Sequence, residues 1–289
     1  MSLLLALLAQ IGPFPQSGTP PVSPLPPEIL ERKRQERERT GWPEPVAVPQ
    51  QRYSASLTAC LGVAKSEPTT AADNAQEWLD RAQGDERSEA GQCLGMALVQ
   101  LERWDEAEAA FLAARLAAAP EAHERRARLA AMAGNAAIAR GDGEAALGAL
   151  ETARADADAA GNRLLAGDIA IDRSRALVAL GRLAEARDTL GEARSASPSN
   201  PQGWLLSATL SRRMGDLAMA QVQILEAARL LPIDAEIGLE AGVIAVLSGN
   251  EQAARKSWQS VVAAAPDSEA AGTARFYLAQ LGQEEPPAP

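Results

Sequence analysis

Three stretches of eighteen residues follow one plan and end at prolines that lie thirty-four residues apart. They read GRLAEARDTLGEARSASP, GDLAMAQVQILEAARLLP and GNEQAARKSWQSVVAAAP, and they close at Pro198, Pro232 and Pro266. A repeat of this period indicates one small structural unit stacked several times, each copy contacting its neighbours. The period therefore constrains the fold more strongly than any other feature of the chain.

Each stretch reads as one helix between a glycine and a proline. The glycine allows the left-handed C-cap that ends a preceding helix, and the proline cannot continue the helix that it closes. Three inward positions, spaced by four and then three residues, share one helical face. The first is always alanine, which allows close approach of a second helix, and the next is bulky. These triplets are Ala186, Leu190 and Ala193; Ala220, Ile224 and Ala227; and Ala254, Trp258 and Val261.

The residues before each stretch supply a first helix, so each unit is a helical hairpin. NPQGWLLSATLSRRMG has Pro201 near its start, where proline is tolerated, and DAEIGLEAGVIAVLSG has Gly242 where a small residue allows close contact. Two earlier segments, CLGMALVQLERWDEAEAAFLAARLAAAP and AGNAAIARGDGEAALGALETARA, repeat the plan. The composition suits it, because 46% of the chain is hydrophobic but only 3% is aromatic, which leaves Ala and Leu to build the core.

This pattern resembles the tetratricopeptide repeat family. Its signature has Leu-Gly in the first helix, then Ala, a bulky aromatic residue and Ala in the second, and a closing Pro. The resemblance implies an all-α, right-handed α-solenoid with a terminal capping helix. Five units start near Ser88, Ala127, Gly167, Pro201 and Ala235, with longer helices in the first three. The signature residues of the first unit are Leu94, Gly95, Ala107, Phe111, Ala114 and Pro120.

The chain divides into six parts on this interpretation. A degenerate helical unit, residues 53–87, leads into the five repeats of residues 88–266. Two segments precede it and two follow the repeats. They are a signal-like apolar segment with a Pro-rich linker, 1–27; a charged segment and linker, 28–52; the capping helix, 267–282; and a disordered tail, 283–289.

The first residues indicate export. An apolar block, Leu3 to Ala9, precedes a proline-rich stretch, as in a short secretory signal, although no Lys or Arg precedes the block. A disordered apolar tail or an uncleaved anchor is the alternative. We therefore expect a periplasmic or envelope-associated protein of the bacterial envelope type, with a cytoplasmic location as the alternative.

The charge of the chain argues against nucleic acid as a partner, and its hydropathy argues against a membrane-spanning segment. The formal charge of -10 argues against nucleic acid, because binding phosphates needs a basic surface. The charged stretch EILERKRQERER mixes both signs, which favours a solvated, marginal helix over a nucleic-acid arm. No apolar run approaches the roughly 20 residues that crossing a bilayer needs.

The resemblance implies that the first helices line a concave groove that holds segments of partner proteins. The residues predicted to line it are Gln92, Met96, Asn135, Ile138, Asp168, Arg175, Leu205, Thr209, Arg212, Arg213, Leu239 and Val243, with Val99, Arg128, Ile171, Val178, Glu236 and Val246 beside them.

The arginines suggest the chemistry of the partner. Our hypothesis is that Arg175 and Arg212 pair with carboxylates of an acidic segment. The alternative is that these arginines only keep the face soluble. Asn135 lies where some family members hold a C-terminal carboxylate, but Gln92 and Met96 replace the expected Lys and Asn, so we do not predict that clamp.

Cys60 and Cys93 lie nearly one period apart on neighbouring first helices. If the chain is exported, a disulfide would join the leading unit to the array. The alternative is two small buried hydrophobic residues.

No constellation for catalysis is present. One His and two Cys do not make a zinc site, and the sequence has no P-loop, no dinucleotide turn and no nucleophile elbow. We expect no cofactor, no metal and no enzyme. Two functions remain, namely a module that binds a partner protein in its groove, and a structural subunit of a larger assembly or homo-oligomer. The oligomeric state is left open.

Overall fold

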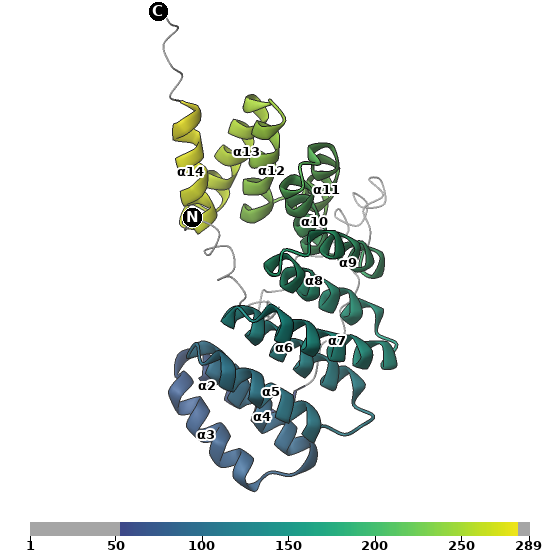
Figure 1. Cartoon of the computed structure of the whole chain (residues 1–289). Helices are drawn as coiled ribbons and strands as arrows, with labels where there is room; N and C mark the ends of the chain where they lie inside the picture. Colours follow the sequence, from purple (N-terminus) through teal and green to yellow (C-terminus); the bar gives the residue numbers. More distant parts are fainter. Residues whose placement is uncertain (1–52, 283–289) are drawn as a thin grey trace, which may run out of the picture.

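A computed structural model describes residues 53–282, in which helical hairpins stack side by side into a curved array (Figure 1). This part contains thirteen helices and no strand. The prediction of an all-α, right-handed solenoid with a capping helix is confirmed. The predictions for residues 1–52 and 283–289 concern segments outside the described residues.

The hairpins pair a first helix with a second helix and alternate along the array. The leading unit is α2 (Ala55–Ser66) with α3 (Pro68–Arg81), and α14 (Glu269–Leu281) closes the array. Between them lie five units. They are α4 (Gly84–Gln100) with α5 (Trp104–Ala117), α6 (His123–Arg140) with α7 (Gly143–Ala159), α8 (Arg163–Ala179) with α9 (Leu183–Ala196), α10 (Pro201–Arg213) with α11 (Leu217–Leu230), and α12 (Ala235–Leu247) with α13 (Glu251–Ala264).

The first three repeats begin earlier than the sequence predicts. Their first helices start at Gly84, His123 and Arg163, four residues before the predicted starts. These helices have 17, 18 and 17 residues, whereas α10 and α12 have 13 each. About one extra helical turn at the N-terminal end accounts for the difference.

Side chains and glycines set the turn inside each hairpin. In the fourth repeat Gly215 has a φ of +84°, a conformation that ends α10 at little steric cost. Asp216 follows it and accepts a hydrogen bond from the backbone N–H of Met219, which caps the N-terminus of α11. The same sequence of glycine and then capping residue recurs at Gly249 and Asn250 before α13.

Small residues of the first helix lie directly under bulky residues of the second. A Cβ added to Gly95 would lie 2.4 Å from Cε1 of Phe111, and one added to Gly242 would lie 2.1 Å from Nε1 of Trp258. Phe111 and Trp258 are almost completely buried. The pairing of a small residue with a bulky one, predicted from the repeat pattern, is therefore what holds the two helices of a hairpin together.

A disulfide joins the leading unit to the first repeat in the structure. Cys60 of α2 and Cys93 of α4 are bonded, with their Cα atoms 6.1 Å apart. Cys93 is completely buried, and the described residues contain no free cysteine. The bridge fixes α2 against α4 at the end of the array where the repeat pattern is least regular.

No helix within residues 53–282 is both long enough and apolar enough to cross a bilayer.

Candidate functional site

The first helices α6 and α8 lie on the inner side of the curve, and α7, α9 and α11 lie on its outer side (Figure 1). The structure divides the predicted groove residues by exposure. Gln92, Met96, Ile138 and Leu205 are buried, because neighbouring helices cover them, so they offer a partner little surface. Arg213 is exposed, and the half-buried members are Asn135, Asp168, Arg175, Thr209, Arg212, Leu239 and Val243.

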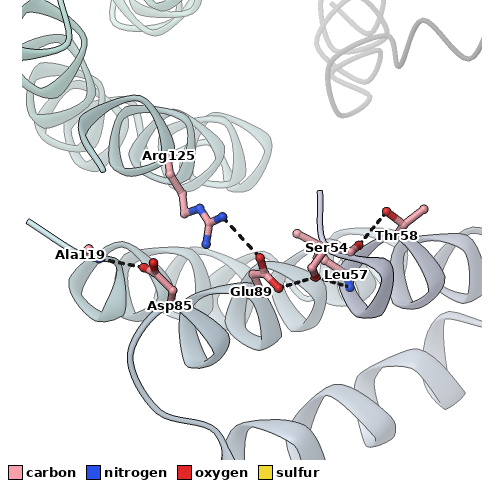
Figure 2. A network of polar contacts seen from close by, with 7 residues as sticks. All are labelled: Ser54, Leu57, Thr58, Asp85, Glu89, Ala119 and Arg125. Carbon is pink, nitrogen blue, oxygen red and sulfur yellow. Dashed lines mark hydrogen bonds and ion pairs between the residues drawn. The ribbon is translucent and has the colours of Figure 1, made fainter. Parts of the chain in front are cut away.

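Glu89 of α4 connects the leading unit with the first two repeats (Figure 2). The Ser54 hydroxyl donates to Glu89 Oε2 at 2.5 Å, and Nη2 of Arg125 in α6 lies 3.3 Å from Glu89 Oε1. Ser54 also accepts a hydrogen bond from the backbone N–H of Leu57 and so caps α2. One carboxylate therefore fixes the start of α2 and one side of α6.

A buried carboxylate lies at the centre of the array. Asp172 of α8 is only 3% exposed and accepts hydrogen bonds from Nδ2 of Asn135 at 3.0 Å and from Nη1 of Arg175 at 2.5 Å. Burial raises the pKa of Asp172, and the charge of Arg175 and the bond from Asn135 oppose that rise. Arg175 and Asn135, both predicted as groove residues, are thus connected through a carboxylate that was not among the predicted residues.

Asp168 lies one helical turn before Asp172 and has the most clearly perturbed acidity. Burial raises the pKa of Asp168 from 3.8 to about 6, and the neighbouring charge of Asp172 adds to the rise. The hydrogen bond from Nδ2 of Asn200, at 3.0 Å, and the charge of Arg128 act in the opposite direction. At a given pH, a larger fraction of Asp168 is therefore protonated in the folded protein than in the unfolded chain.

Asp168→Asn is expected to stabilise the protein by about 2 kcal/mol near pH 7.5 and by almost nothing near pH 4. The folded carboxyl holds its proton more tightly than the unfolded one, so its contribution favours folding at low pH and is lost as the pH rises through about 6. Asn copies the neutral form and can still accept from Asn200. Urea unfolding at the two pH values measures this, and an equal change at both would contradict the cause given.

The second predicted arginine is also paired. Nε and Nη2 of Arg212 in α10 donate to the two carboxylate oxygens of Glu240 in α12, at 2.6 and 3.2 Å. This fork geometry joins two successive first helices. No carboxylate partner is found for the neighbouring Arg213 within residues 53–282.

Four buried side-chain polar atoms on α6 have no hydrogen-bond partner in the described part of the protein, and two of them belong to predicted groove residues. Those two are Nε of Arg128, a donor, and Oδ1 of Asn135, an acceptor; the others are Nδ1 of His123 and Nη1 of Arg125. Buried polar atoms are normally paired, so each is a candidate to bind a ligand or water once its side chain rotates. No group of three or more His, Cys, Asp or Glu residues within 53–282 could hold a metal.

Glu89, Asp172 and Glu240 were not among the residues predicted from sequence. Asp172 could have been found from its spacing of three residues to Arg175, which is typical of an ion pair on one helix. Glu240 could have been found only by comparing neighbouring units, because it reaches Arg212 across the boundary between two repeats.

The arrangement is similar to solved tetratricopeptide repeat structures. TTC0263, a thermophilic TPR protein from Thermus thermophilus, is 19% identical over 67% of this chain and 97% of its own, with a TM-score of 0.52. PilW, described as a widely conserved type IV pilus biogenesis factor, is 17% identical over 76% of this chain and 99% of its own, with a TM-score of 0.60. PilF of Pseudomonas aeruginosa is 14% identical over 78% and 96%, with a TM-score of 0.59.

No protein-family model matches the sequence, and no curated protein matches it significantly. At identities this low the similarity shows the fold. The chain has the α-solenoid fold of tetratricopeptide repeat proteins.

Proposed function

We propose that this protein is a non-catalytic interaction module that binds a segment of a partner protein along its concave surface. The observation that carries the proposal is a continuous run of half-exposed side chains on successive first helices. It passes from Asn135 on α6 to Asp168 and Arg175 on α8, Thr209 on α10 and Leu239 on α12. The run is polar on α6, α8 and α10 and ends on the apolar Leu239 of α12, so it suits an extended or helical peptide that carries both kinds of group.

Two of the unpaired atoms of α6, Oδ1 of Asn135 and Nε of Arg128, support this proposal. A peptide backbone carries an N–H donor and a C=O acceptor in each residue. The N–H could donate to Oδ1 of Asn135, and the C=O could accept from Nε–H of Arg128, two atoms that have no partner in the free protein. Binding would give both atoms a hydrogen bond after small side-chain rotations. Part of the affinity would then come from removing the free-energy cost of two buried polar atoms that have no hydrogen bond in the free protein.

We propose that the partner segment is acidic, as the arginines suggest, and that its carboxylates compete with carboxylates of this protein for those arginines. Arg175 and Arg212 already contact Asp172 and Glu240, so a partner carboxylate would have to share or exchange these contacts. Arg213 is exposed and offers a charge that the described structure leaves unmatched. The first contact would therefore be made at the C-terminal end of α10, where Arg212 and Arg213 are adjacent.

We propose a location at the bacterial cell envelope. The bond between Cys60 and Cys93 supports it, because stable disulfides are typical of oxidising compartments. The apolar block at Leu3 to Ala9 supports it through its similarity to a secretory signal. That the structurally similar PilW is a type IV pilus biogenesis factor is consistent with it by analogy of fold only.

Affinity capture from envelope and soluble fractions tests the groove. The variant Arg175→Glu, Arg212→Glu is expected to recover the partner at least about 10-fold less than wild type, because two attractive contacts become repulsive. Arg213→Glu alone is expected to act in the same direction without disturbing any internal pair. The matched control, Arg187→Glu with Lys256→Glu, makes the same charge change on the exposed surfaces of α9 and α13.

Wild type and control are expected to recover the same protein in equal amounts. Equal recovery by the groove variants would place the interface elsewhere. Circular dichroism of every variant shows whether a loss of binding reflects a loss of folding.

A further inference from the structure

The second helix of the fourth repeat, α11, exposes an apolar stripe on the outer side of the array. Val222 and Leu225 are each 60% exposed and Met219 is 46% exposed. They are spaced by three residues, so they lie along one strip of the helix. Leu231 and Ile233, 41% and 80% exposed, follow at the end of the helix. We call these five residues the α11 face.

The other second helices of the repeats do not share this feature. The positions that correspond to Val222 are Ala109, Gly148, Asp188 and Lys256, and those that correspond to Leu225 are Leu112, Glu151, Gly191 and Gln259. Of these, the only large aliphatic residue is Leu112, and it is partly buried in the core. Packing within the array therefore does not require large aliphatic side chains at both positions, and their exposure on α11 needs another explanation.

The size of the α11 face fits the centre of a protein interface. The exposed fractions of the three residues on α11 correspond to roughly 300 Å², and those of Leu231 and Ile233, which follow the helix, to roughly 200 Å² more; the largest apolar patch on a monomer, which is often functional, is of this order. A stable interface buries about 800 Å² on each partner, of which up to about 65% is apolar in homodimers. The patch and a polar rim around it would together reach that size.

Charge favours a second copy of the same chain, with the two α11 helices antiparallel. A twofold axis that passes between Val222 and Leu225 places Val222 of each chain against Leu225 of the other chain. Nearly the same register brings the exposed N-cap residue Asp216 close to Arg229 of the second copy, whose guanidinium already pairs with Glu226 of its own helix and would lie between the two carboxylates. Antiparallel helices also bring opposite ends of their dipoles together. A parallel arrangement would instead place like charges together.

We propose that the protein forms a twofold-symmetric dimer through the α11 face. The dimer leaves the inner surface of each array free. It presents two partner-binding surfaces, which raises the avidity for a partner that carries or assembles into several copies of its segment. The dimer does not depend on the proposed groove, since α11 lies on the outer side of the curve.

Light scattering after size exclusion, with the full chain over a range of concentrations, tests the dimer. The expected mass is twice the 30.3 kDa of one chain. Val222→Asp with Leu225→Asp is expected to weaken dimerisation at least about 100-fold, because four unpaired charges would enter the centre of the interface. Both side chains are exposed, so the monomer is expected to keep its helical spectrum.

The control is Lys256→Asp with Gln259→Asp, which places two carboxylates at the same two positions on α13 and lowers the net charge by three units, compared with two in the α11 variant. It is expected to remain a dimer. A wild-type mass of one chain at about 100 μM would overturn the proposal, because a specific, stable interface would hold the two chains together at that concentration. Persistence of the dimer in the α11 variant would also overturn it and move the contact to another surface.

Discussion

Gly242→Ala is expected to lower the free energy of unfolding by about 3 kcal/mol, although alanine is the better helix former. The new Cβ would lie 2.1 Å from Nε1 and 2.5 Å from Cδ1 of Trp258, so the indole must move. Trp258 is 2% exposed, and its Nε1 donates to the carbonyl oxygen of Leu239 at 3.1 Å. Displacing it breaks that bond and opens the contact with Tyr277 of the capping helix, whose ring lies 5.1 Å away.

Gly272→Ala is the matched control for this change. It makes the same substitution within α14, where an added Cβ would meet nothing within 4 Å. Helix propensity then acts alone, and we expect a stabilisation of up to about 1 kcal/mol. The midpoint of urea unfolding and the tryptophan fluorescence follow both variants. If Gly242→Ala were as stable as wild type, close packing of Gly242 against Trp258 would not hold this hairpin.

Reduction of the disulfide is expected to lower the free energy of unfolding by about 3–4 kcal/mol. Cys60 and Cys93 are separated by 33 residues, and the bond limits the unfolded chain over that length. The leading unit is expected to lose its structure first, because α2 is attached to the array at this end. Thermal unfolding with and without a thiol reductant measures the difference.

The variant Cys60→Ala with Cys93→Ala is the control for reduction. Its stability is expected to match that of the reduced wild type and to be insensitive to the reductant. Mass spectrometry after alkylation reports whether the wild-type bond was opened. An unchanged melting temperature in protein shown to be reduced would contradict a stabilising role for the bridge.

The fold could be predicted from sequence because the repeat supplies independent copies of the same signal. The inward residues at Ala186, Leu190, Ala220 and Ile224 are all buried as predicted. The first three repeats start four residues before their predicted positions, because the extra turn precedes the signature residues and has no counterpart in the later repeats. Local patterns therefore determined the hairpins better than they determined where the helices begin.

The candidate site was predicted less completely, since side-chain partners depend on how neighbouring repeats approach. When each helix is considered alone, Arg175 and Arg212 are predicted to be free to pair with carboxylates of a partner. The structure pairs them with Asp172 and Glu240, and it buries Gln92 and Met96, whose inward position the family geometry had indicated. Ion pairs between repeats and burial by a neighbouring helix are properties of the stack, which a single repeat does not encode.

Hydrogen–deuterium exchange on the complex with the captured partner tests partner binding on the concave surface most directly. We predict slower exchange in α6, α8, α10 and α12 on binding, with no change in α7, α9 and α13. Arg175 and Asn135 should lie within the protected segments. Slower exchange confined to the second helices, with the first helices unchanged, would contradict the proposed groove.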